Sequence, residues 1–333
     1  MTAPAARLQT SLPLIGGKRL MLFGGRAHPT LAAQIGRELG VALAPVTLKT
    51  FSNGEVYCRF GESVRGADVF LVQPMCGNAE TGVTANDALM ELLLLIDAAV
   101  GASAHRVIAV TPWYGYSRQD KKSAPREPIS ARMVARTLEA AGVDRVLTMD
   151  LHAGQLHGFF GVPVDHMTAL MMLADHFAGL DDDLVVVAPD AGRVKLNKQF
   201  AIRLGAGLAI LDKDRPRHQA AEIGHVIGDV HDKTAIIVDT AGTLRAAAEA
   251  VVSSGARRIF AAATHAVFAG RAYENLRSSP LERIVVTDTI PLRPDVPASI
   301  DVVSCASLLA ASIRRIFTDD SVSAVFGGKS HPF

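Results

Sequence analysis

The sequence predicts an α/β protein with two tandem domains, each a mostly parallel sheet flanked by helices. Short apolar runs recur along the chain, helix-like segments separate most of them, and polar turn residues follow many of them. This alternation is typical of βαβ units, whose strands are covered on both faces. With 333 residues, 49% of them hydrophobic, the chain is long enough to fill two cores.

The predicted strands are rich in Val, Ile, Leu and Ala. They cover Leu20–Phe23, Val69–Val72, Val107–Val110, Val146–Met149, Leu184–Ala188, Leu208–Leu211, Ile236–Val238, Ile259–Ala263 and Ile284–Val286. Short apolar runs without alternation predict strands buried on both faces. A similarity between VDRVLTMD, which ends at Asp150, and LERIVVTD, which ends at Asp288, indicates a duplication.

We expect the boundary between the two domains near residue 165, after the sequence VPVDH. The expected parts are an N-terminal extension (1–17), an N-terminal domain (18–165), a C-terminal domain (166–326) and a tail (327–333). The first residues lack the charged start and long apolar core of a signal peptide, so we expect a loose extension there.

Composition argues against several functional classes. A formal net charge of +1 with 20% charged residues gives no overall field that would favour nucleic acid or an acidic membrane surface. The apolar stretch Leu89–Val100 is interrupted by Glu91 and Asp97 and is too short to cross a bilayer. We therefore expect neither a nucleic-acid partner nor a membrane span.

The cysteines do not indicate a disulfide framework or a zinc motif. Cys58, Cys76 and Cys305 lie far apart in the sequence, whereas zinc motifs place cysteines close together in pairs. We expect a cytoplasmic protein.

The segment Thr234–Ile259 reads as a strand, a turn of small residues and a helix. The turn consists of Asp239, Thr240, Ala241, Gly242 and Thr243. A helix start presents free N–H groups and a positive dipole end, which together suit a phosphate. An ordinary strand-to-helix turn is the alternative, since Asp is also a good helix cap.

Polar side chains also follow other predicted strands. They include the basic loop with Arg118, Gln119, Lys121, Lys122 and Arg126, the pair Asp150 and His152, Asp190, and the stretch with Lys213, Arg215 and Arg217. Each group alone has a structural explanation, such as a solvated face. Together at the carboxyl edge of parallel strands, where open α/β sheets bind ligands, they favour a site for phosphate and Mg²⁺.

One further segment keeps two interpretations. Residues Lys49–Asp68 alternate apolar and polar side chains around Ser52, Asn53 and Gly54, which predicts an extended arm or hairpin. This arm either is a structural flap or faces a ligand. His157 is interpreted as a helix or turn residue.

An ordered set of motifs resembles one known family. The set comprises FSNGE at Phe51–Glu55, GYSRQDKK at Gly115–Lys122, REPISA at Arg126–Ala131, DLHAGQLHGFF from Asp150, APDAGR from Ala188, LDKDRP from Leu211 and ATH from Ala263. In order and spacing it resembles the ribose-phosphate pyrophosphokinases, also called phosphoribosyl pyrophosphate synthetases. The similarity runs from about Leu20 to Phe326.

The resemblance implies two phosphoribosyltransferase-like domains and the activity of a ribose-phosphate diphosphokinase. Such an enzyme transfers the β,γ-pyrophosphoryl group of ATP to O1 of ribose 5-phosphate, giving 5-phosphoribosyl 1-pyrophosphate and AMP for nucleotide biosynthesis. It also implies dependence on Mg²⁺ and assembly into homo-oligomers, either dimers or hexamers.

By resemblance, the nucleotide site consists of Phe51, Asn53, Glu55, Arg118 and Gln119. Phe51 would stack on adenine while Asn53 and Glu55 contact its edge, supplied by a neighbouring subunit. Arg118 and Gln119 would hold the nucleotide. The loop from Lys121 to Arg126 resembles a segment that closes over the site and keeps water out.

The resemblance also assigns metal-binding and catalytic roles. Asp150 and His152 would bind the metal, and Asp190 would bind the Mg²⁺ near the sugar. Lys213 and Arg215 would neutralise the charge that develops on the transferred group.

The ribose 5-phosphate site would be the turn Asp239, Thr240, Ala241, Gly242 and Thr243. Here the chain departs from the family, because the turn is several residues shorter and lacks acidic residues that hold the ribose hydroxyls. Ala241 in place of Gly also restricts the turn. Asn53 replaces the usual Asp, and Asp214 stands where a basic residue is common.

These departures leave alternatives. The chain is either an active pyrophosphokinase, impaired by its shortened loop, or a catalytically deficient regulatory subunit or paralogue. A phosphoribosyltransferase acting on a base is disfavoured, because the FSNGE and RQDKK motifs would then have no role.

Overall fold

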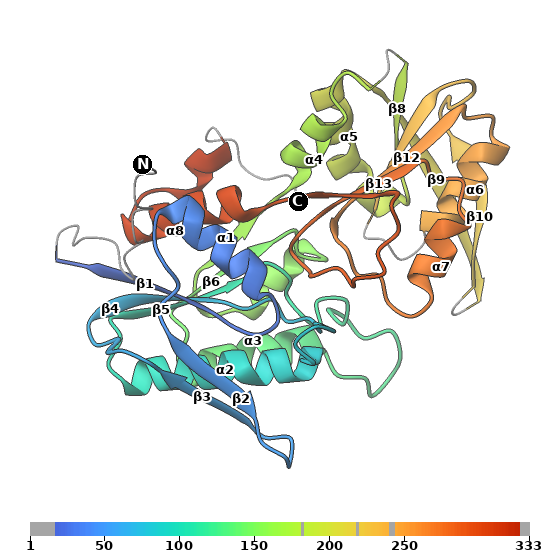
Figure 1. The fold of residues 1–333 in the computed structure, drawn as a ribbon. Coiled ribbons are helices and arrows are strands. Elements are labelled where there is room, and N and C mark those ends of the chain that lie inside the picture. The colour runs from blue at the N-terminus through green and yellow to red at the C-terminus, as the bar shows by residue number, and fades with distance from the viewer. Residues whose placement is uncertain (1–16, 181–182, 218–219, 240–243, 327–333) are drawn as a thin grey trace. The chain divides into compact units, whose positions relative to one another are not determined.

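The computed structural model describes residues 17–180, 183–217, 220–239 and 244–326, which fall into two units (Figure 1). Among them, the N-terminal unit contains residues 17–167 and 305–326, and the C-terminal unit contains residues 168–304. Each unit is a mainly parallel sheet flanked by helices. The expected α/β class is confirmed.

The N-terminal unit has a five-stranded sheet in the order β1-β4-β5-β6-β7, with every neighbouring pair parallel. Its strands are β1 (Arg19–Gly24), β4 (Ala67–Val72), β5 (Arg106–Thr111), β6 (Arg145–Met149) and β7 (Val164–Met167). A separate antiparallel hairpin consists of β2 (Val46–Thr50) and β3 (Val56–Phe60). The arm predicted around Gly54 is therefore a hairpin.

Helices cover both faces of this sheet, as the continuous apolar runs require. The helices are α1 (Pro29–Leu39), α2 (Ala85–Gly101), α3 (Ser130–Ala141) and α8 (Ala306–Phe317), with 3-10 helices η1 (Gly154–Phe159) and η3 (Val322–Phe326). Met21 and Phe23 pack into one core with Leu92 of α2 and Val134 of α3. Helices α1 and α8 lie on the other face (Figure 1).

Local signals explain where these helices begin and end. Helix α2 starts at a capping box, in which Thr84 and Asp87 exchange side-chain and backbone hydrogen bonds. Helix α3 ends at Gly142, whose φ of 96° is the left-handed conformation that glycine adopts without strain.

The last helix of the described chain, α8, belongs to the N-terminal unit. It packs against α1, and the Arg314 guanidinium donates to the Leu39 carbonyl at the C-terminus of α1 (3.1 Å). The expected C-terminal domain included residues 305–326, which the structure places with the first unit instead. The reason is the apolar face of α8, whose Leu309 and Ile313 are fully buried.

The C-terminal unit has a seven-stranded sheet in the order β10-β9-β8-β11-β12-β13-β14. Its strands are β8 (Leu184–Ala188), β9 (Gly207–Arg217), β10 (Ala220–Ile227), β11 (Thr234–Val238), β12 (Arg258–His265), β13 (Arg283–Thr287) and β14 (Ile300–Val303). Only β10 runs antiparallel to its neighbour. The helices are α4 (Leu170–His176), α5 (Val194–Leu204), α6 (Leu244–Ser253), α7 (Ala272–Arg277) and the 3-10 helix η2 (Ala191–Arg193).

Every strand predicted from an apolar run is present, whereas β7, β10 and β14 were not predicted. The sequence of β7, VDHM, places charged and polar residues in a four-residue strand, and β14 reads IDVV. Both lie at sheet edges, where one side of the strand has no neighbour and polar residues are tolerated.

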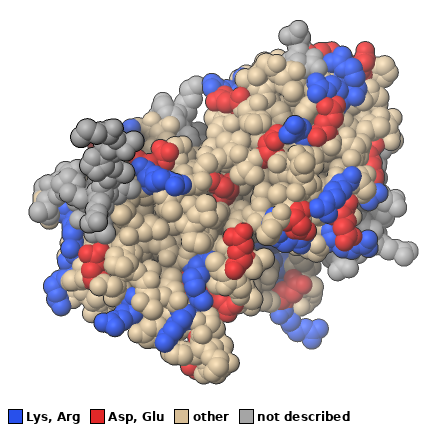
Figure 2. All heavy atoms as spheres, viewed as in Figure 1, with Lys and Arg blue, Asp and Glu red and all other residues tan. Residues whose placement is uncertain are grey.

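Surface charge is mixed. On the face in Figure 2, basic and acidic side chains are interspersed and form no large area of one sign, consistent with the net charge of +1. Within the described residues, no helix is long and apolar enough to cross a membrane.

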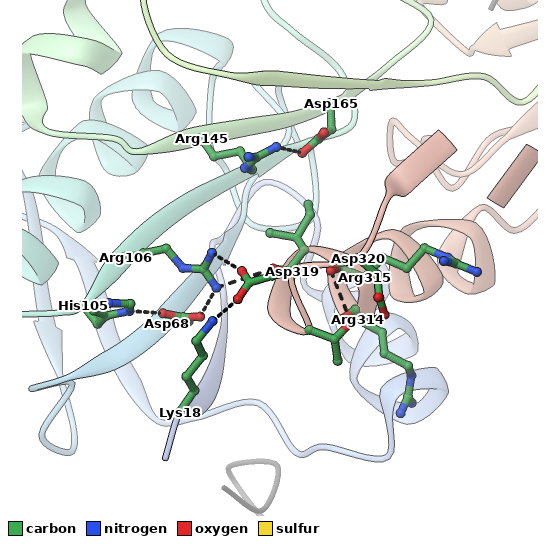
Figure 3. Close-up of polar contacts among 12 residues, drawn as sticks. Lys18, Asp68, His105, Arg106, Arg145, Asp165, Arg314, Arg315, Asp319 and Asp320 are labelled. Atoms are coloured by element: carbon green, nitrogen blue, oxygen red, sulfur yellow. Dashed lines mark hydrogen bonds and ion pairs between the residues drawn. The ribbon is translucent and has the colours of Figure 1, made fainter. Parts of the chain in front are cut away.

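A buried carboxylate joins the start of the sheet to the end of α8 (Figure 3). We call Lys18, Asp68, His105, Arg106 and Asp319 the basal cluster. Asp68 is 1% exposed and bonds both the Arg106 guanidinium and the His105 ring (2.7 Å to Nδ1). Asp319 accepts from Arg106 (2.9 Å) and Lys18. The hydrogen bond to Asp68 raises the pKa of Arg106, so this guanidinium stays charged.

The two carboxylates of the basal cluster differ in burial, which predicts unequal effects on stability. Asp68→Asn leaves the Arg106 charge without its buried partner and should lower the free energy of unfolding by about 3 to 5 kcal/mol. Asp319→Asn removes a carboxylate whose side chain is 55% exposed, and surface pairs of this kind contribute about 1 kcal/mol or less. Urea unfolding followed by Trp113 fluorescence compares them, since Trp113 is the single tryptophan and lies in the N-terminal unit. Equal losses would contradict this view of the cluster.

Candidate active site

In the N-terminal unit, the predicted site residues follow two adjacent strands. The loop with Arg118 and Gln119 comes after β5, and Asp150 and His152 come after β6, which pairs with β5 in parallel. The two groups therefore leave the same edge of the sheet. The buried Asp120 links them, because its carboxylate accepts a hydrogen bond from the Gln155 amide of η1.

The turn after β6 has an unusual backbone conformation at Asp150. Its φ is +37°, which is strained for a residue other than glycine. The Asp150 amide donates to the Met167 carbonyl (2.9 Å), and the next amide, that of Leu151, donates to Nε2 of the His166 ring (2.8 Å). The neighbouring strand β7 thus holds the turn that places Asp150 and His152.

His157 contacts this turn through His166. Its Nε2 lies 3.2 Å from Nδ1 of His166, and the ring centroids are 5.1 Å apart. His157 lies in η1, in agreement with its interpretation as a helix or turn residue. His166 was not predicted as a site residue, although its position in a polar edge strand is a usable signal.

The loop after β5 presents basic side chains to solvent. Arg118, Gln119 and the stretch from Lys121 to Arg126 are exposed. The Gln119 side-chain oxygen accepts from the Ser130 hydroxyl (2.6 Å), and its carbonyl accepts from the Ala131 amide (3.2 Å), which fixes Gln119 at the start of α3. The Glu127 carboxylate accepts from the amides of Ser123 and Ala124 and orders the loop internally.

Phe51 lies at the tip of the β2–β3 hairpin and is 43% exposed. Its ring makes an edge-to-face contact with Tyr57, at 5.8 Å between centroids. The Lys49 ammonium lies over the ring, 4.7 Å from its centre. The Asn53 side chain accepts from the Glu55 amide (3.2 Å). In this structure Asn53 therefore stabilises the turn itself.

A buried polar network supports the hairpin, and the sequence analysis missed it. Glu91 of α2 is 0% exposed and accepts from the Arg26 amide (2.7 Å), Arg26 Nε (2.6 Å) and Gln73 Nε2 (2.9 Å). Arg26 Nη2 reaches the Thr50 hydroxyl (3.1 Å), directly before Phe51. The usable signal was Glu91 within the apolar run of α2, since a buried carboxylate requires partners.

In the C-terminal unit, Asp190 follows β8 and Asp239 follows the adjacent strand β11. The connection from β8 leads to β9 on one side of the sheet, and that from β11 leads to β12 on the other. Such a reversal creates a crevice at the carboxyl ends of the strands, where open α/β sheets bind ligands. The side-chain amide of the buried Asn197 donates to the Arg193 carbonyl (3.0 Å) and lies within 3.5 Å of the Val238 carbonyl, which joins the two strand ends.

The remaining site residues are only partly described. Thr240, Ala241, Gly242 and Thr243 lie outside the described residues. For Lys213 and Arg215 the structure gives backbone only: both lie within β9, which continues to Arg217 and pairs with β10. The prediction that they follow the end of a strand is wrong, because β9 continues past the residues that pair with β8 and pairs there with β10.

Comparisons with known proteins agree with this arrangement. A family model for the N-terminal domain of ribose phosphate pyrophosphokinase matches residues 20–142, and one for the phosphoribosyl synthetase-associated domain matches residues 220–327. The ribose-phosphate pyrophosphokinase of Caldanaerobacter subterraneus subsp. tengcongensis is 48% identical over 314 residues, covering 92% of this chain and 98% of that protein. That of Gloeobacter violaceus is 46% identical, covering 94% and 95%.

The chain belongs to the ribose-phosphate pyrophosphokinase family. The crystal structure of phosphoribosylpyrophosphate synthetase from Mycobacterium smegmatis matches its fold with a TM-score of 0.81 and 42% identity, covering 90% of this chain and 99% of that one. The family resemblance deduced from the ordered motifs is confirmed.

Enzymes of the ribose-phosphate pyrophosphokinase family work on phosphates, and the donor set here suits a metal bound together with them. Among the described residues, no group of three or more His, Cys, Asp or Glu side chains could hold a metal alone. Mg²⁺ is commonly bound through one or two protein groups, substrate phosphates and water. Asp150 and Asp190 each supply a carboxylate, the protein group through which Mg²⁺ is bound in that way.

Burial lowers the pKa of His157 below its ordinary value of 6.5. The unfolded chain therefore binds more protons than the folded one as the pH falls through about 6.5. The contribution of His157 to stability should be complete above that pH and decline below it. An NMR titration of the His157 ring, assigned with His157→Gln, should give a midpoint below 6.5. A midpoint at or above 6.5 would contradict the burial argument.

Proposed function

We propose that the chain makes 5-phosphoribosyl 1-pyrophosphate and AMP from ATP and ribose 5-phosphate. The observation that carries this proposal is the 48% identity to a ribose-phosphate pyrophosphokinase over 92% of the chain. The arrangement of polar groups supports it, because they follow adjacent parallel strands in each unit. The free thiols of Cys58 and Cys76 fit a reducing compartment such as the cytoplasm.

ATP is assigned to residues of the N-terminal unit. The exposed ring of Phe51 offers a face on which adenine can stack, and Tyr57 and Lys49 hold that ring in place. Glu55 is assigned to the adenine edge, with Asn53 shaping the turn. Arg118 and Gln119 are assigned to the nucleotide phosphates, for which Arg is well suited.

Ribose 5-phosphate is assigned to the C-terminal unit. Asp239 follows β11, and α6, whose start suits an anion, begins at Leu244. Asp190 is assigned to the Mg²⁺ near the sugar, and its own side chain caps η2 by accepting from the Arg193 amide (3.1 Å). The position of both residues at the crevice between β8 and β11 supports this assignment.

The reaction is an in-line displacement at the β-phosphorus of ATP. The O1 hydroxyl oxygen of the sugar bonds to that phosphorus and loses its proton, while the bond to the oxygen shared with the α-phosphorus breaks and AMP leaves with the electron pair. Lys213 and Arg215 are assigned to the negative charge that develops during transfer. Bound Mg²⁺ would neutralise phosphate charge; Asp150 and His152 are assigned to the metal that accompanies the nucleotide, and Asp190 to the Mg²⁺ near the sugar.

An oligomer would complete the site. The hairpin carries Phe51 away from the sheet of its own unit, alongside α2 (Figure 1), and the ring remains exposed. We assign Phe51 to Glu55 to the adenine site of a neighbouring subunit, so the active form would be a dimer or a multiple of dimers, such as a hexamer.

The proposed activity is tested by measuring AMP release from Mg·ATP with and without ribose 5-phosphate. We expect AMP and phosphoribosyl pyrophosphate in equal amounts, and no AMP without the sugar. Lys213→Ala serves as the control, because loss of one group that stabilises the transition state costs about 10²-fold or more in kcat. Formation of ADP in place of AMP, or AMP release independent of the sugar, would refute the proposal.

The short turn after Asp239 predicts weak use of the sugar. A hydrogen bond to a charged group contributes about 1.5 to 3 kcal/mol. Loss of two such bonds to the ribose hydroxyls lowers kcat/KM for ribose 5-phosphate by about 10²- to 10⁴-fold. Affinity for Mg·ATP should be ordinary, since its assigned residues lie in the other unit.

An insertion variant tests this prediction. A short insert with two Asp residues directly after Asp239 should raise kcat/KM for ribose 5-phosphate selectively, whereas a Gly-Ser insert of equal length should not. If the native chain already uses the sugar with ordinary efficiency, or if both inserts act alike, the short turn is not a defect. If neither insert gives activity while Mg·ATP still binds, the catalytically deficient paralogue becomes the better description.

A further inference from the structure

A backbone hydrogen bond and a side-chain hydrogen bond from β7 contribute to holding the strained turn at Asp150. Strands β6 and β7 pair in parallel up to Met149 and Met167, and the Asp150 amide adds one more bond to the Met167 carbonyl. At Leu151 the chain has left the sheet. There the imidazole of His166, rather than a carbonyl, accepts the amide hydrogen at 2.8 Å.

These contacts define the tautomer of each imidazole. A backbone amide can only donate, so Nε2 of His166 accepts and the ring proton of neutral His166 lies on Nδ1. That Nδ1–H points to Nε2 of His157, 3.2 Å away, which therefore accepts. A proton added to either accepting nitrogen would face an N–H group. The two rings thus form a series of hydrogen bonds from η1 through β7 to Leu151.

Leu151 is the residue between Asp150 and His152. Its side chain is buried, and its amide is held by His166. Loss of the amide hydrogen bond would therefore free the backbone of Leu151 while its side chain stays packed. The positive φ of Asp150 is strained for a residue other than glycine and persists only where the surroundings enforce it. The bond from Leu151 to His166 is one of the contacts that enforce it.

We infer that His166, oriented by His157, is a positioning residue that holds Asp150 and His152 in place for Mg·ATP through the Leu151 amide. The inference rests on the proposed function for the roles of Asp150 and His152. Neither imidazole is assigned to the metal or to substrate. Groups that orient metal ligands typically change metal affinity or activity by about 10- to 100-fold when they are removed.

The first test needs no substrate. Hydrogen–deuterium exchange of peptides containing Leu151 is compared in the native full-length chain, in His166→Leu, and in His166→Gln, whose side-chain oxygen can replace Nε2 as acceptor. A hydrogen bond contributes about 0.5 to 1.5 kcal/mol, so the Leu151 amide should exchange about 2- to 10-fold faster in His166→Leu. It should remain protected in His166→Gln.

The second test measures calorimetric binding of Mg·ATP without sugar, together with steady-state kinetics. His166→Leu should weaken Mg·ATP binding and lower kcat by about 10- to 100-fold, with little change in KM for ribose 5-phosphate. His166→Gln should recover most of both losses, and His157→Leu should show a smaller effect of the same kind. His176→Leu is the matched control, since His176 lies in the C-terminal unit and is partly exposed.

The outcomes separate this inference from the proposed function. Unchanged exchange at Leu151 in His166→Leu would overturn the inference, as would faster exchange with unchanged Mg·ATP binding and kcat. Failure of His166→Gln to restore either property would also overturn it, because the role would not then be hydrogen-bond acceptance. If the native chain forms no AMP, the proposed function fails, while exchange and Mg·ATP binding still decide the positioning role. Should His166→Leu not fold, His157→Leu is compared with the native chain in both tests, and unchanged exchange at Leu151 together with unchanged Mg·ATP binding would overturn the inference.

Discussion

Parallel pairing is the constraint on which the candidate site depends. When neighbouring strands run in the same direction, their carboxyl ends lie at one edge, and every connection leaves from that edge. In the N-terminal unit this brings together the loops after β5 and β6, and in the C-terminal unit those after β8 and β11. The opposite edge of the N-terminal sheet carries the basal cluster, so this cluster and the candidate site lie at different ends of the same strands.

Each end of the N-terminal sheet contains a buried carboxylate paired with an arginine. Asp68 pairs with Arg106 at the start of β4 and β5, where it joins segments far apart in the sequence. Glu91 pairs with Arg26 beyond the end of β1 and supports the hairpin that carries Phe51. In both places the buried carboxylate accepts hydrogen bonds from a guanidinium. Arginine suits this role because its side chain stays charged in proteins.

The sequence predicted the strands and the polar groups at their ends because both follow from local pattern. A continuous apolar run marks a strand buried on both faces, and the residues after it lie at the ligand edge. It did not predict His166, whose importance comes from a contact with Leu151, fifteen residues earlier. Nor did it predict the pairing of β9 with β10, because Asp214 and Arg215 lack the apolar pattern of a sheet strand. Helix α8 was assigned to the wrong unit, since its apolar face does not specify which partner it covers.

The path of the chain also bears on the order in which the protein can fold during synthesis. The N-terminal unit is discontinuous, because β7 and α8 are separated by the entire C-terminal unit. Until α8 has left the ribosome, the face of the sheet that it covers together with α1 is incompletely covered. Arg106 then has Asp68 as a partner but not yet Asp319. The segment translated second can complete its own core before the one translated first, which reverses the usual N-to-C order of domain folding.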